Sequence, residues 1–495
     1  MKRLFVVLSL IMLLFGCTEA PSEPVPPEAP EEPAQEYLDS EFSLEYPSSW
    51  EPDLSQSPES EFFAGDSNCH VLVRKLPYPP KQLILHLEEY SGEVADGNRL
   101  DFAFEHEGIP FNSYNLFSYC ECDTNWVTVN CFADADQSVV EDIFSSVSCS
   151  YVAKEPETGM GIPGIVPTYF GADLEDFVFS YCDSIGQAKE AGASIAHRYY
   201  SWGEMEPSKG NYNWTVSDFF YDIHAAQKMP ISADIQVVYT NQLGDLPRDM
   251  QFTSLNESRF KERFADFMIA FLDRYPKIKY VEIGNEVDIY LNIHPEQVYE
   301  FKDFYSYVHD EIKAEHPNVK VGTIFAYHAA KQSNSTWIIE ELNDIGDFNG
   351  FTVYVHQDKY YFNGSMDDVK PYFDEIDGIS GDKPYAFTET GWSSSSTLGS
   401  SEEMQSEYVG EVFSILKERK NRVEFFTWYM SHDISDSFCS EVAEGFITED
   451  IEFLLDNQEY MQNFEDFICT QGLRTADDEP KLAWNTWIEE IDRFD

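Results

Sequence analysis

Short apolar runs alternate with amphipathic stretches of helical length from Ile162 onward. The apolar runs are typical of strands buried on both faces, and apolar residues recur at helical spacing over 258–275, 295–316 and 401–418. This alternation predicts an α/β domain with a parallel sheet. It comprises eight units, with predicted strands at Ile165–Phe170, Ser194–Tyr199, Ile231–Val238, Tyr280–Ile283, Lys320–Ile324, Gly350–Val355, Tyr385–Thr388 and Val423–Tyr429.

Eight β/α units over residues 160–495 favour a (β/α)8 TIM barrel with loop insertions. The alternative is a doubly wound open sheet. That fold would have a glycine-rich phosphate turn after an early strand, and the sequence contains none. The barrel is therefore the predicted fold.

A small α+β domain is predicted over residues 37–152, before the barrel. Phe42–Trp50 has the pattern of a strand that ends in a proline turn, 115–122 and 125–133 alternate like a hairpin, and 136–145 has helical spacing. The opening Phe-x-Leu-x-Tyr-Pro-x-x-Trp and the closing helix resemble the PsbP-like fold of small extracytoplasmic domains. This resemblance implies no catalytic role, so we expect a spacer or binding module.

The N-terminus has the pattern of an export signal over residues 1–17. Lys2 and Arg3 precede an apolar run, which ends in Leu-Phe-Gly-Cys and resembles a lipobox with Cys17 as the acylated residue. An ordinary signal peptide and an uncleaved anchor are the alternatives. Residues 18–36 form a Pro/Glu-rich tether, which proline and charge repulsion keep extended. We expect a secreted, cell-surface or extracytoplasmic protein that meets a membrane only through this N-terminal lipid or signal anchor.

Export implies an oxidising compartment, so the eight cysteines besides Cys17 are expected to form disulfides. We predict a bridge between Cys439 and Cys469, and an odd cysteine in each domain leaves a bridge between the domains open. No Cys-x-x-Cys pair exists, which disfavours a zinc site, and we expect no metal.

Charge and aromatic content narrow the range of partners. The 90 acidic residues against 32 basic ones disfavour nucleic acid and anionic membranes as partners. The 38 Phe and 29 Tyr residues suit a neutral carbohydrate ligand, which proteins grip with aromatic faces. We expect a monomer.

Two glutamates follow predicted strands directly. Glu286 ends Gly284-Asn285-Glu286 after the fourth strand, and Glu389 lies in Thr-Glu-Thr-Gly-Trp after the seventh. The active site of a TIM barrel forms where the strands end, so the two carboxylates would meet across the barrel mouth. Paired carboxylates can cleave a glycosidic bond.

Further polar and aromatic residues follow predicted strands at the same rim. Taken singly, each has a structural explanation, because a lone arginine is usually an ion-pair partner and a lone tryptophan usually belongs to the core. Their joint placement at one rim favours a site. They are Arg198 and Trp202 after strand two, Asn285 after four, Tyr354 and His356 after six, Trp392 after seven and Trp428 after eight.

Four segments in this order resemble the retaining glycoside hydrolases of clan A. Gly-Asn-Glu matches the strand-4 motif and Thr-Glu-Thr-Gly-Trp the strand-7 motif. Arg198 to Trp214 resembles the strand-2 segment, and Gly472 to Trp484 the closing segment. The resemblance covers 160–495. It implies a (β/α)8 barrel that uses no cofactor.

The resemblance also implies roles. Glu389 would be the nucleophile and Glu286 the acid/base, with carboxyls roughly 5–5.5 Å apart. Arg198 would keep Glu389 ionised, Tyr354 would donate a hydrogen bond to it, and Asn285 would bind the sugar 2-hydroxyl.

Aromatic residues would form the sugar-binding surface. Trp428 would be the floor under the cleaved sugar, and Trp392 and Trp202 would be further stacking surfaces. His356 is assigned to the nucleophile region without a settled role.

The sequence thus predicts a surface-anchored retaining glycosidase that cleaves a β-linked polysaccharide or oligosaccharide. Transglycosylation would use the same residues. The alternative from another class is a non-catalytic carbohydrate-binding lipoprotein on a glycosidase-like barrel.

Overall fold

The structure is a computed structural model. It describes residues 35–39, 42–52, 62–66, 69–76, 99–106, 109–120, 123–132, 138–149, 162–166, 177–251, 254–356, 358–362, 365–445 and 457–493. The predicted signal peptide with Cys17, and residues 18–34 of the predicted tether, lie outside the described residues. The chain divides into two compact units, one up to Ala153 and one from Lys154 onward.

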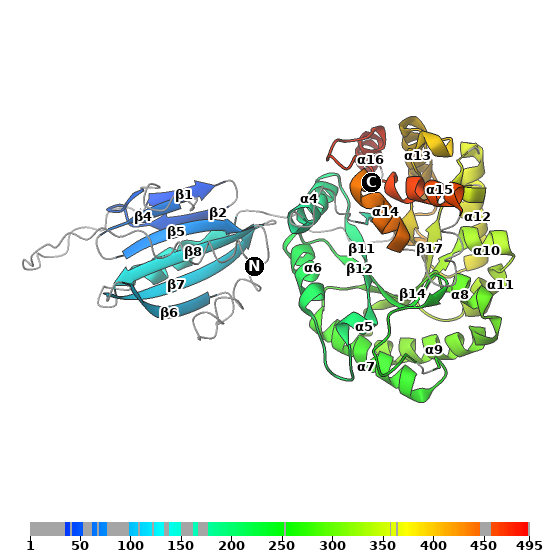
Figure 1. The fold of residues 1–495 in the computed structure, drawn as a ribbon, viewed down its shortest axis with the longest axis horizontal. Coiled ribbons are helices and arrows are strands. Elements are labelled where there is room, and N and C mark those ends of the chain that lie inside the picture. The colour runs from blue at the N-terminus through cyan, green and yellow to red at the C-terminus, as the bar shows by residue number, and fades with distance from the viewer. Residues whose placement is uncertain are drawn as a thin grey trace, which may run out of the picture. The chain divides into compact units, whose positions relative to one another are not determined.

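The first unit contains antiparallel sheets and a helix (Figure 1). Within its described residues, three strands pair in the order β1-β2-β9 and six in the order β3-β4-β5-β8-β7-β6. The predicted hairpin is present as β7 and β8, and the predicted helix as α3. The elements are β1 (Gln35–Asp39), β2 (Phe42–Tyr46), β3 (Glu51–Pro52), β4 (Phe62–Gly65), β5 (Cys69–Leu76), β6 (Arg99–His106), β7 (Ile109–Cys120), β8 (Asp123–Phe132), α3 (Ser138–Ser146) and β9 (Ser148–Cys149).

The second unit is a (β/α)8 barrel, as the sequence predicts (Figure 1). Its parallel ladder runs in the order β15-β14-β12-β11-β10-β19-β18-β17-β16. The fifth strand consists of β15 and β16 on either side of Thr323, which closes the ring. The strands are β10 (Ile162–Ile165), β11 (Ile195–Tyr200), β12 (Ile231–Tyr239), β14 (Tyr280–Asn285), β15 (Lys320–Gly322), β16 (Ile324–Ala326), β17 (Asn349–Val353), β18 (Tyr385–Thr390) and β19 (Val423–Trp428), with β13 (Gln242–Leu243) paired antiparallel to β12.

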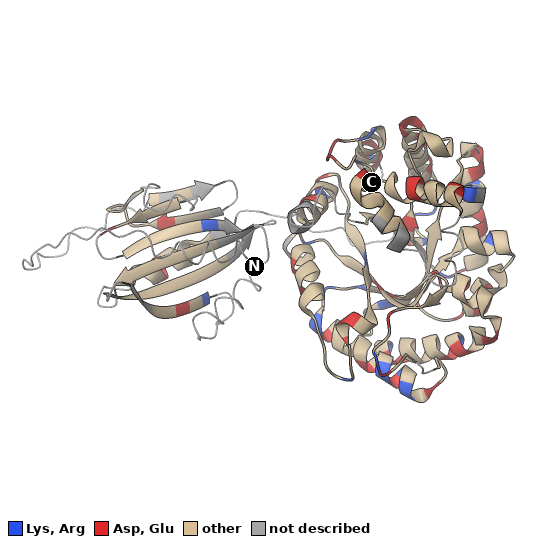
Figure 2. Ribbon diagram, viewed as in Figure 1, with Lys and Arg blue, Asp and Glu red and all other residues tan. Residues whose placement is uncertain are grey.

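Helices surround this sheet, and the strongly periodic stretches of the sequence form α7, α9 and α13. None of the helices in the described segments is both long enough and apolar enough to cross a membrane. Acidic residues are spread over the outer helices (Figure 2). The helices are α4 (Phe177–Glu190), α5 (Trp202–Met205), α6 (Thr215–Ala226), α7 (Ser258–Arg274), α8 (Val287–Ile293), α9 (Val298–Glu315), α10 (Tyr327–Ser333), α11 (Thr336–Leu342), α12 (Val369–Ser380), α13 (Glu402–Glu418), α14 (Asp436–Gly445), α15 (Gln458–Cys469) and α16 (Leu482–Asp492).

The first barrel strand begins earlier than predicted. β10 pairs with β19 from Ile162 onward, and Gly164 lies so close to Ile195 that a Cβ atom there would clash with it. This close approach lets the first and second strands pair in register. Residues 167–170 of the predicted strand lie outside the described residues.

A cluster of buried aromatic side chains packs α7 against the barrel. Phe260, Phe264, Phe267 and Phe271 recur at helical spacing and are fully buried. Trp202 lies edge-on to Phe260 and Phe264, with ring centroids 5.3 and 5.0 Å away. Burying each such side chain contributes roughly 1.5–3 kcal/mol, so this cluster fixes the segment that follows β11.

A long excursion after β19 contains α14 and α15, and the predicted disulfide between Cys439 and Cys469 joins them, with a Cα–Cα distance of 5.9 Å. α15 also contacts the turn after β17: the Tyr360 and Tyr460 hydroxyls lie 2.8 Å apart, and Asn463 donates to the Lys359 carbonyl at 3.0 Å. A second disulfide joins β5 to β8 in the first unit.

Replacing Cys439 and Cys469 together with serine is expected to lower the free energy of unfolding of the barrel by about 3–4 kcal/mol. The reason is that the bridge closes a loop of 30 residues, whose entropy the unfolded chain would regain. Urea unfolding followed by tryptophan fluorescence measures the change. The control replaces Cys69 and Cys131 with serine and should leave the barrel transition unmoved. An unchanged barrel midpoint in the first variant would contradict the prediction.

Candidate active site

The first candidate carboxyl, Glu286, lies where β14 passes into α8. Its φ of 52° is left-handed, a conformation that costs a non-glycine residue on the order of 1–3 kcal/mol. Thr352 Oγ1, just before the end of β17, donates a hydrogen bond of 2.6 Å to Glu286 Oε1. A strained turn that aims a carboxyl at the barrel axis is typical of a functional position.

The second candidate carboxyl, Glu389, lies on β18 and is only 7% exposed. Two hydroxyls hold it, one on each oxygen. Tyr199 donates to Oε1 and Tyr354 donates to Oε2, both at 2.6 Å. Because these tyrosines come from different strand ends, the closed barrel is what assembles this arrangement.

One residue links the two glutamates. Thr352, which binds Glu286, is paired with Glu389 in the β17–β18 ladder. A register shift lies just before this pair, between Phe351 and Thr352. The two carboxyls are therefore neighbours across β17, although 103 residues separate them in the chain.

The electrostatics of the two carboxyls differ in one respect. Burial raises the pKa of Glu286, the nearby Glu389 raises it further, and the single Thr352 hydrogen bond opposes this. Burial also raises the pKa of Glu389, but two hydrogen bonds, from Tyr199 and Tyr354, counteract it. Because hydrogen bonds to a carboxylate favour its ionised form, Glu389 is the easier of the two to ionise.

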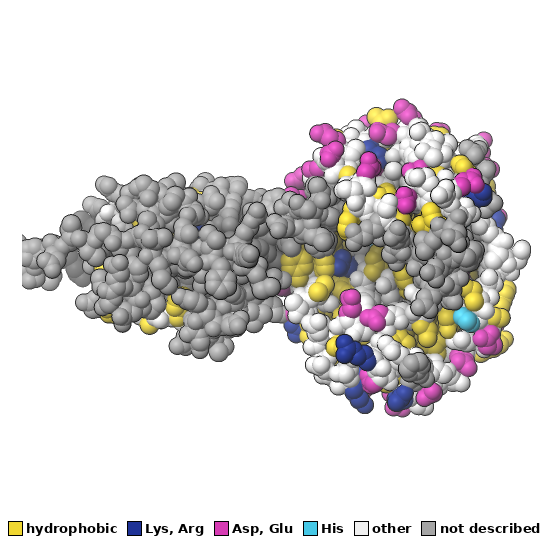
Figure 3. Space-filling model, viewed as in Figure 1, with side chains coloured by type: hydrophobic (Ala, Val, Ile, Leu, Met, Phe, Trp, Pro, Cys, Tyr) yellow, Lys and Arg dark blue, Asp and Glu magenta, His cyan; other side chains and the backbone are white. Residues whose placement is uncertain are grey.

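Tyrosines surround the pair. Besides Tyr199 and Tyr354, the side chains of Tyr239, Tyr360 and Tyr429 are close enough for Glu286 to help raise their pKa values, after burial as the main cause. Hydrophobic side chains gather in a hollow inside the barrel rim, with acidic side chains around it (Figure 3). Tyrosines thus supply aromatic groups around the pair.

The prediction that Arg198 keeps Glu389 ionised needs correction. Arg198 lies on the outer face of β11, and its guanidinium carbon is 3.2 Å from the ring centroid of Phe220 on α6. Side chains alternate along a strand, so Tyr199 faces the barrel interior and Arg198 does not. The hydroxyl of Tyr199 occupies the position expected of the guanidinium.

The three predicted stacking surfaces, Trp202, Trp392 and Trp428, also need correction, because each is at most 1% exposed. Trp202 donates to Glu206, Trp392 to Ser400 and Trp428 to the Gln471 carbonyl, so all three indole N–H groups are satisfied internally. They are core residues. At the end of the eighth strand it is the next residue, Tyr429, that contacts Tyr354, with ring centroids 5.9 Å apart.

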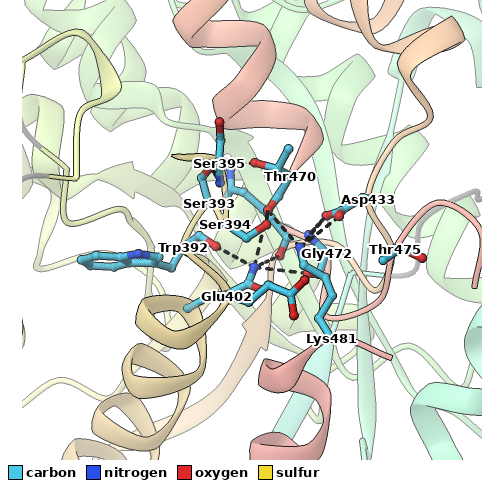
Figure 4. Close-up of polar contacts among 12 residues, drawn as sticks. Trp392, Ser393, Ser394, Ser395, Glu402, Asp433, Thr470, Gly472, Thr475 and Lys481 are labelled. Atoms are coloured by element: carbon cyan, nitrogen blue, oxygen red, sulfur yellow. Dashed lines mark hydrogen bonds and ion pairs between the residues drawn. The ribbon is translucent and has the colours of Figure 1, made fainter. Parts of the chain in front are cut away.

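A polar cluster fixes the segment that follows Glu389 (Figure 4). The Gln405 amide donates to the Trp392 carbonyl at 2.7 Å and to the Gly472 carbonyl at 3.2 Å. Buried Lys481 pairs with Asp433 at 3.0 Å. These contacts tie the chain after β18 to the closing segment, so the backbone that follows Glu389 is held in place.

Asn285 and His356 lie near the pair without a contact that assigns a role. Asn285 is 4% exposed, and its side-chain oxygen has no hydrogen-bond partner among the described residues. The His356 ring lies 5.3 Å from that of His328, which in turn contacts Tyr354 edge-on.

Tyr199, Thr352 and Tyr429 are site residues that the sequence did not reveal. Side chains alternate along a strand, so only one of Arg198 and Tyr199 can face inward. Because this strand is buried on both faces, its apolar residues do not alternate and do not indicate which of the two it is. Thr352 is a hydroxyl residue inside a buried strand, and this was the available signal for its contact with Glu286.

Two more carboxyls lie in the barrel interior. Asp234 is laterally paired with Tyr199 on one side and with Glu282 on the other, and both acids are fully buried. Burial, then the charges of Glu282, Glu389 and Glu286, raises the pKa of Asp234 well above its ordinary value. Within the described residues no group of three or more His, Cys, Asp or Glu side chains is arranged to hold a metal ion.

Comparison with known proteins supports the fold. No protein-family profile and no curated protein matches the chain. A substituted form of GH5_18 from Streptomyces cattleya, in complex with Manβ1-4GlcNAc, is similar with a TM-score of 0.51 and 14% identity, over 67% of this chain and 80% of that one. GH5_18 from Bifidobacterium longum subsp. infantis gives 0.51 and 12%, over 68% and 79%. The shared feature is the barrel.

Replacing Tyr354 with phenylalanine is expected to raise the pKa of Glu389, because the ionised carboxylate loses one of its two hydrogen bonds. A shift of about one unit corresponds to roughly 1.4 kcal/mol. Carbon-13 NMR titration of glutamate-labelled protein measures it. The matched control is Tyr327→Phe, whose hydroxyl binds Glu375 instead. A Glu389 titration that moves equally in both variants, or in neither, would refute the prediction.

Replacing Glu282 with glutamine is expected to flatten the pH dependence of stability. Burial raises the pKa of Glu282 from 4.5 to about 8, so the folded state binds this proton more tightly and stability falls as pH rises from about 4.5 to 8, by at most about 1.4 kcal/mol per pH unit. Glutamine still accepts from Ser232 and cannot ionise. Thermal melts of parent and variant across this range measure the slope, and parallel slopes would count against the assignment.

Proposed function

We propose that the protein is a retaining glycoside hydrolase that cleaves a β-linked polysaccharide or oligosaccharide. The observation that carries the proposal is the pair of buried carboxyls at the ends of the fourth and seventh barrel strands, held in neighbouring positions by Thr352. The fold likeness to GH5_18 structures, one of them in complex with a β-linked disaccharide, supports it.

In the proposed mechanism Glu389 attacks the anomeric carbon while Glu286 gives its proton to the departing glycosidic oxygen. A glycosyl ester of Glu389 forms, and the leaving group departs as an alcohol. Glu286, now ionised, takes a proton from water, whose oxygen attacks the anomeric carbon and releases Glu389. The configuration of the sugar is retained.

The hydrogen bonds to the two carboxyls support this division of roles. Two hydroxyls stabilise the ionised form of Glu389, as a nucleophile requires, while burial and the neighbouring charge keep Glu286 protonated for its first task. When Glu389 becomes an ester, its charge is lost and the pKa of Glu286 falls, which prepares Glu286 to act as a base.

The proposal also covers sugar binding, membrane anchoring and the role of the first unit. Asn285 would bind the sugar 2-hydroxyl, and the surrounding tyrosines would contact the sugar faces. Cys17 would carry a lipid that anchors the chain, and the PsbP-like first unit would act as a spacer or binding module. No cofactor is part of the mechanism.

Replacing Glu389 with glutamine is expected to lower kcat at least about 10³-fold on any hydrolysed β-glycoside. Replacing Glu286 with glutamine is expected to lower kcat/KM about 10²–10⁴-fold on an alkyl glycoside and far less on a 2,4-dinitrophenyl glycoside, because the dinitrophenolate departs without protonation and kcat/KM does not include the later step in which Glu286 acts as a base. Steady-state kinetics measure both. Glu315→Gln, an exposed carboxyl on α9, is the control and should behave like the parent.

Two outcomes would contradict the proposal. A Glu389→Gln protein as active as the parent would remove the nucleophile assignment. A parent protein that binds β-glycans but releases no aglycone from activated aryl β-glycosides would indicate the alternative, a carbohydrate-binding protein.

A further inference from the structure

A cavity of about 360 Å³ lies on the outer side of β11, next to the candidate active site. It is lined by Arg198, Ser201, Asn213, Ser217 and Phe220, together with Tyr199. A volume of this size lies in the lower range of cavities that bind small molecules. Its lining combines the Arg198 guanidinium with aromatic rings, hydroxyls, an amide and the carboxylate of Glu204; a cation, hydroxyls, an amide and aromatic rings are the groups that recognise a substituted sugar.

Aromatic rings hold the Arg198 guanidinium in place. It lies over Phe220, with its central carbon 3.2 Å from the ring centroid, and it is 5.4 and 5.9 Å from the centroids of Tyr181 and Tyr200. Its Nε atom is buried and has no hydrogen-bond partner among the described residues. The stacking fixes the plane of the fork before any ligand arrives, which lowers the entropy cost of binding.

The charge of Arg198 is unusual in this chain. Acidic residues outnumber basic ones by 90 to 32, and two buried arginines of the barrel, Arg263 and Arg419, each form ion pairs with carboxylates. No described carboxylate lies within ion-pairing distance of Arg198. Glu204 also lines the cavity, but it is exposed. Arg198 is half-buried and has no anionic partner among the described residues, so its guanidinium can accept a ligand that supplies the anion.

The cavity adjoins the catalytic pair. Tyr199 lines it and also donates to Glu389, so a single strand end separates the two regions. A substrate chain that reaches Glu389 and also fills the cavity would pass over this strand end.

We propose that this cavity is a subsite for a sugar that carries an anionic group, a carboxylate or a sulfate ester, with Arg198 as the charged contact. The inference rests on the proposed glycosidase function. The guanidinium fork matches either group with two parallel hydrogen bonds. Because the chain carries a net charge of −58, which repels a polyanion, the substrate is a largely neutral glycan with isolated acidic units.

Binding of three probes to the full chain tests the proposal: methyl β-D-glucuronide, its uncharged methyl ester, and methyl β-D-glucoside 6-sulfate. NMR titration gives each dissociation constant. We expect at least one charged probe to bind the parent about tenfold or more tightly than the ester, and the tighter of the two identifies the anionic group. Equal binding of all three probes would overturn the proposal.

Variants assign the preference to Arg198. Arg198→Met is expected to abolish it, and Arg198→Lys to retain part of it, since the charge stays and the fork is lost. The matched control is Lys209→Met, which removes one positive charge from an exposed position that does not line the cavity. A preference that survives in Arg198→Met would overturn the proposal. Circular dichroism shows whether that variant is folded. If it is not, the binding of the charged probes and of the uncharged ester to the parent protein still decides whether the cavity selects an anionic group.

The test separates this proposal from the proposed function. Binding is read without turnover, so Glu389→Gln should show the same preference as the parent. If the parent protein prefers a charged probe but hydrolyses no glycoside, the result counts only against the proposed mechanism. If it hydrolyses glycosides but shows no preference for a charged probe, the result counts only against the proposed subsite.

Discussion

Two tyrosine hydroxyls hold the buried carboxyl of Glu389, and the arrangement of the barrel mouth depends on this contact. Tyr354 comes from the end of the sixth strand, which pairs directly with the seventh, whereas Tyr199 comes from the second strand and reaches the seventh only because the sheet curves into a barrel. A neutral hydroxyl donor stabilises a carboxylate less than a positively charged donor, such as an arginine, would stabilise it. The two hydroxyls leave Glu389 easier to ionise than Glu286, yet they add no charge that would force both carboxyls to ionise together.

The barrel interior next to Glu286 and Glu389 also favours uncharged groups. Asp234 and Glu282 are fully buried beside Tyr199, and burial, the largest cause in both, raises the pKa of each, which favours their protonated forms. Arg198, next to Tyr199 on β11, faces away from this region onto Phe220. Charge is therefore concentrated on the outer helices, while the barrel axis is lined by hydroxyls and carboxyls whose ionisation is suppressed (Figure 2).

The sequence was sufficient for the barrel and for the positions of both glutamates, because buried runs alternating with amphipathic helices and carboxylates placed just after strands are local signals. It was not sufficient for the direction of side chains at the strand ends. Arg198 and Trp428 were predicted to face the site, and the adjacent Tyr199 and Tyr429 do so instead. Register shifts, such as the one between Phe387 and Thr390, change which residues face inward, and they follow from packing between strands that are distant in sequence.

The nucleophile assignment is the centre of the proposed function, and covalent trapping tests it most directly. A 2-deoxy-2-fluoro β-glycoside with a good leaving group should form an ester that hydrolyses slowly, because the fluorine destabilises the transition state of its release. After proteolysis, mass spectrometry should find one added sugar on the peptide that contains Glu389. A label on any other residue, or an enzyme that turns over glycosides without ever accumulating a labelled peptide, would contradict the assignment.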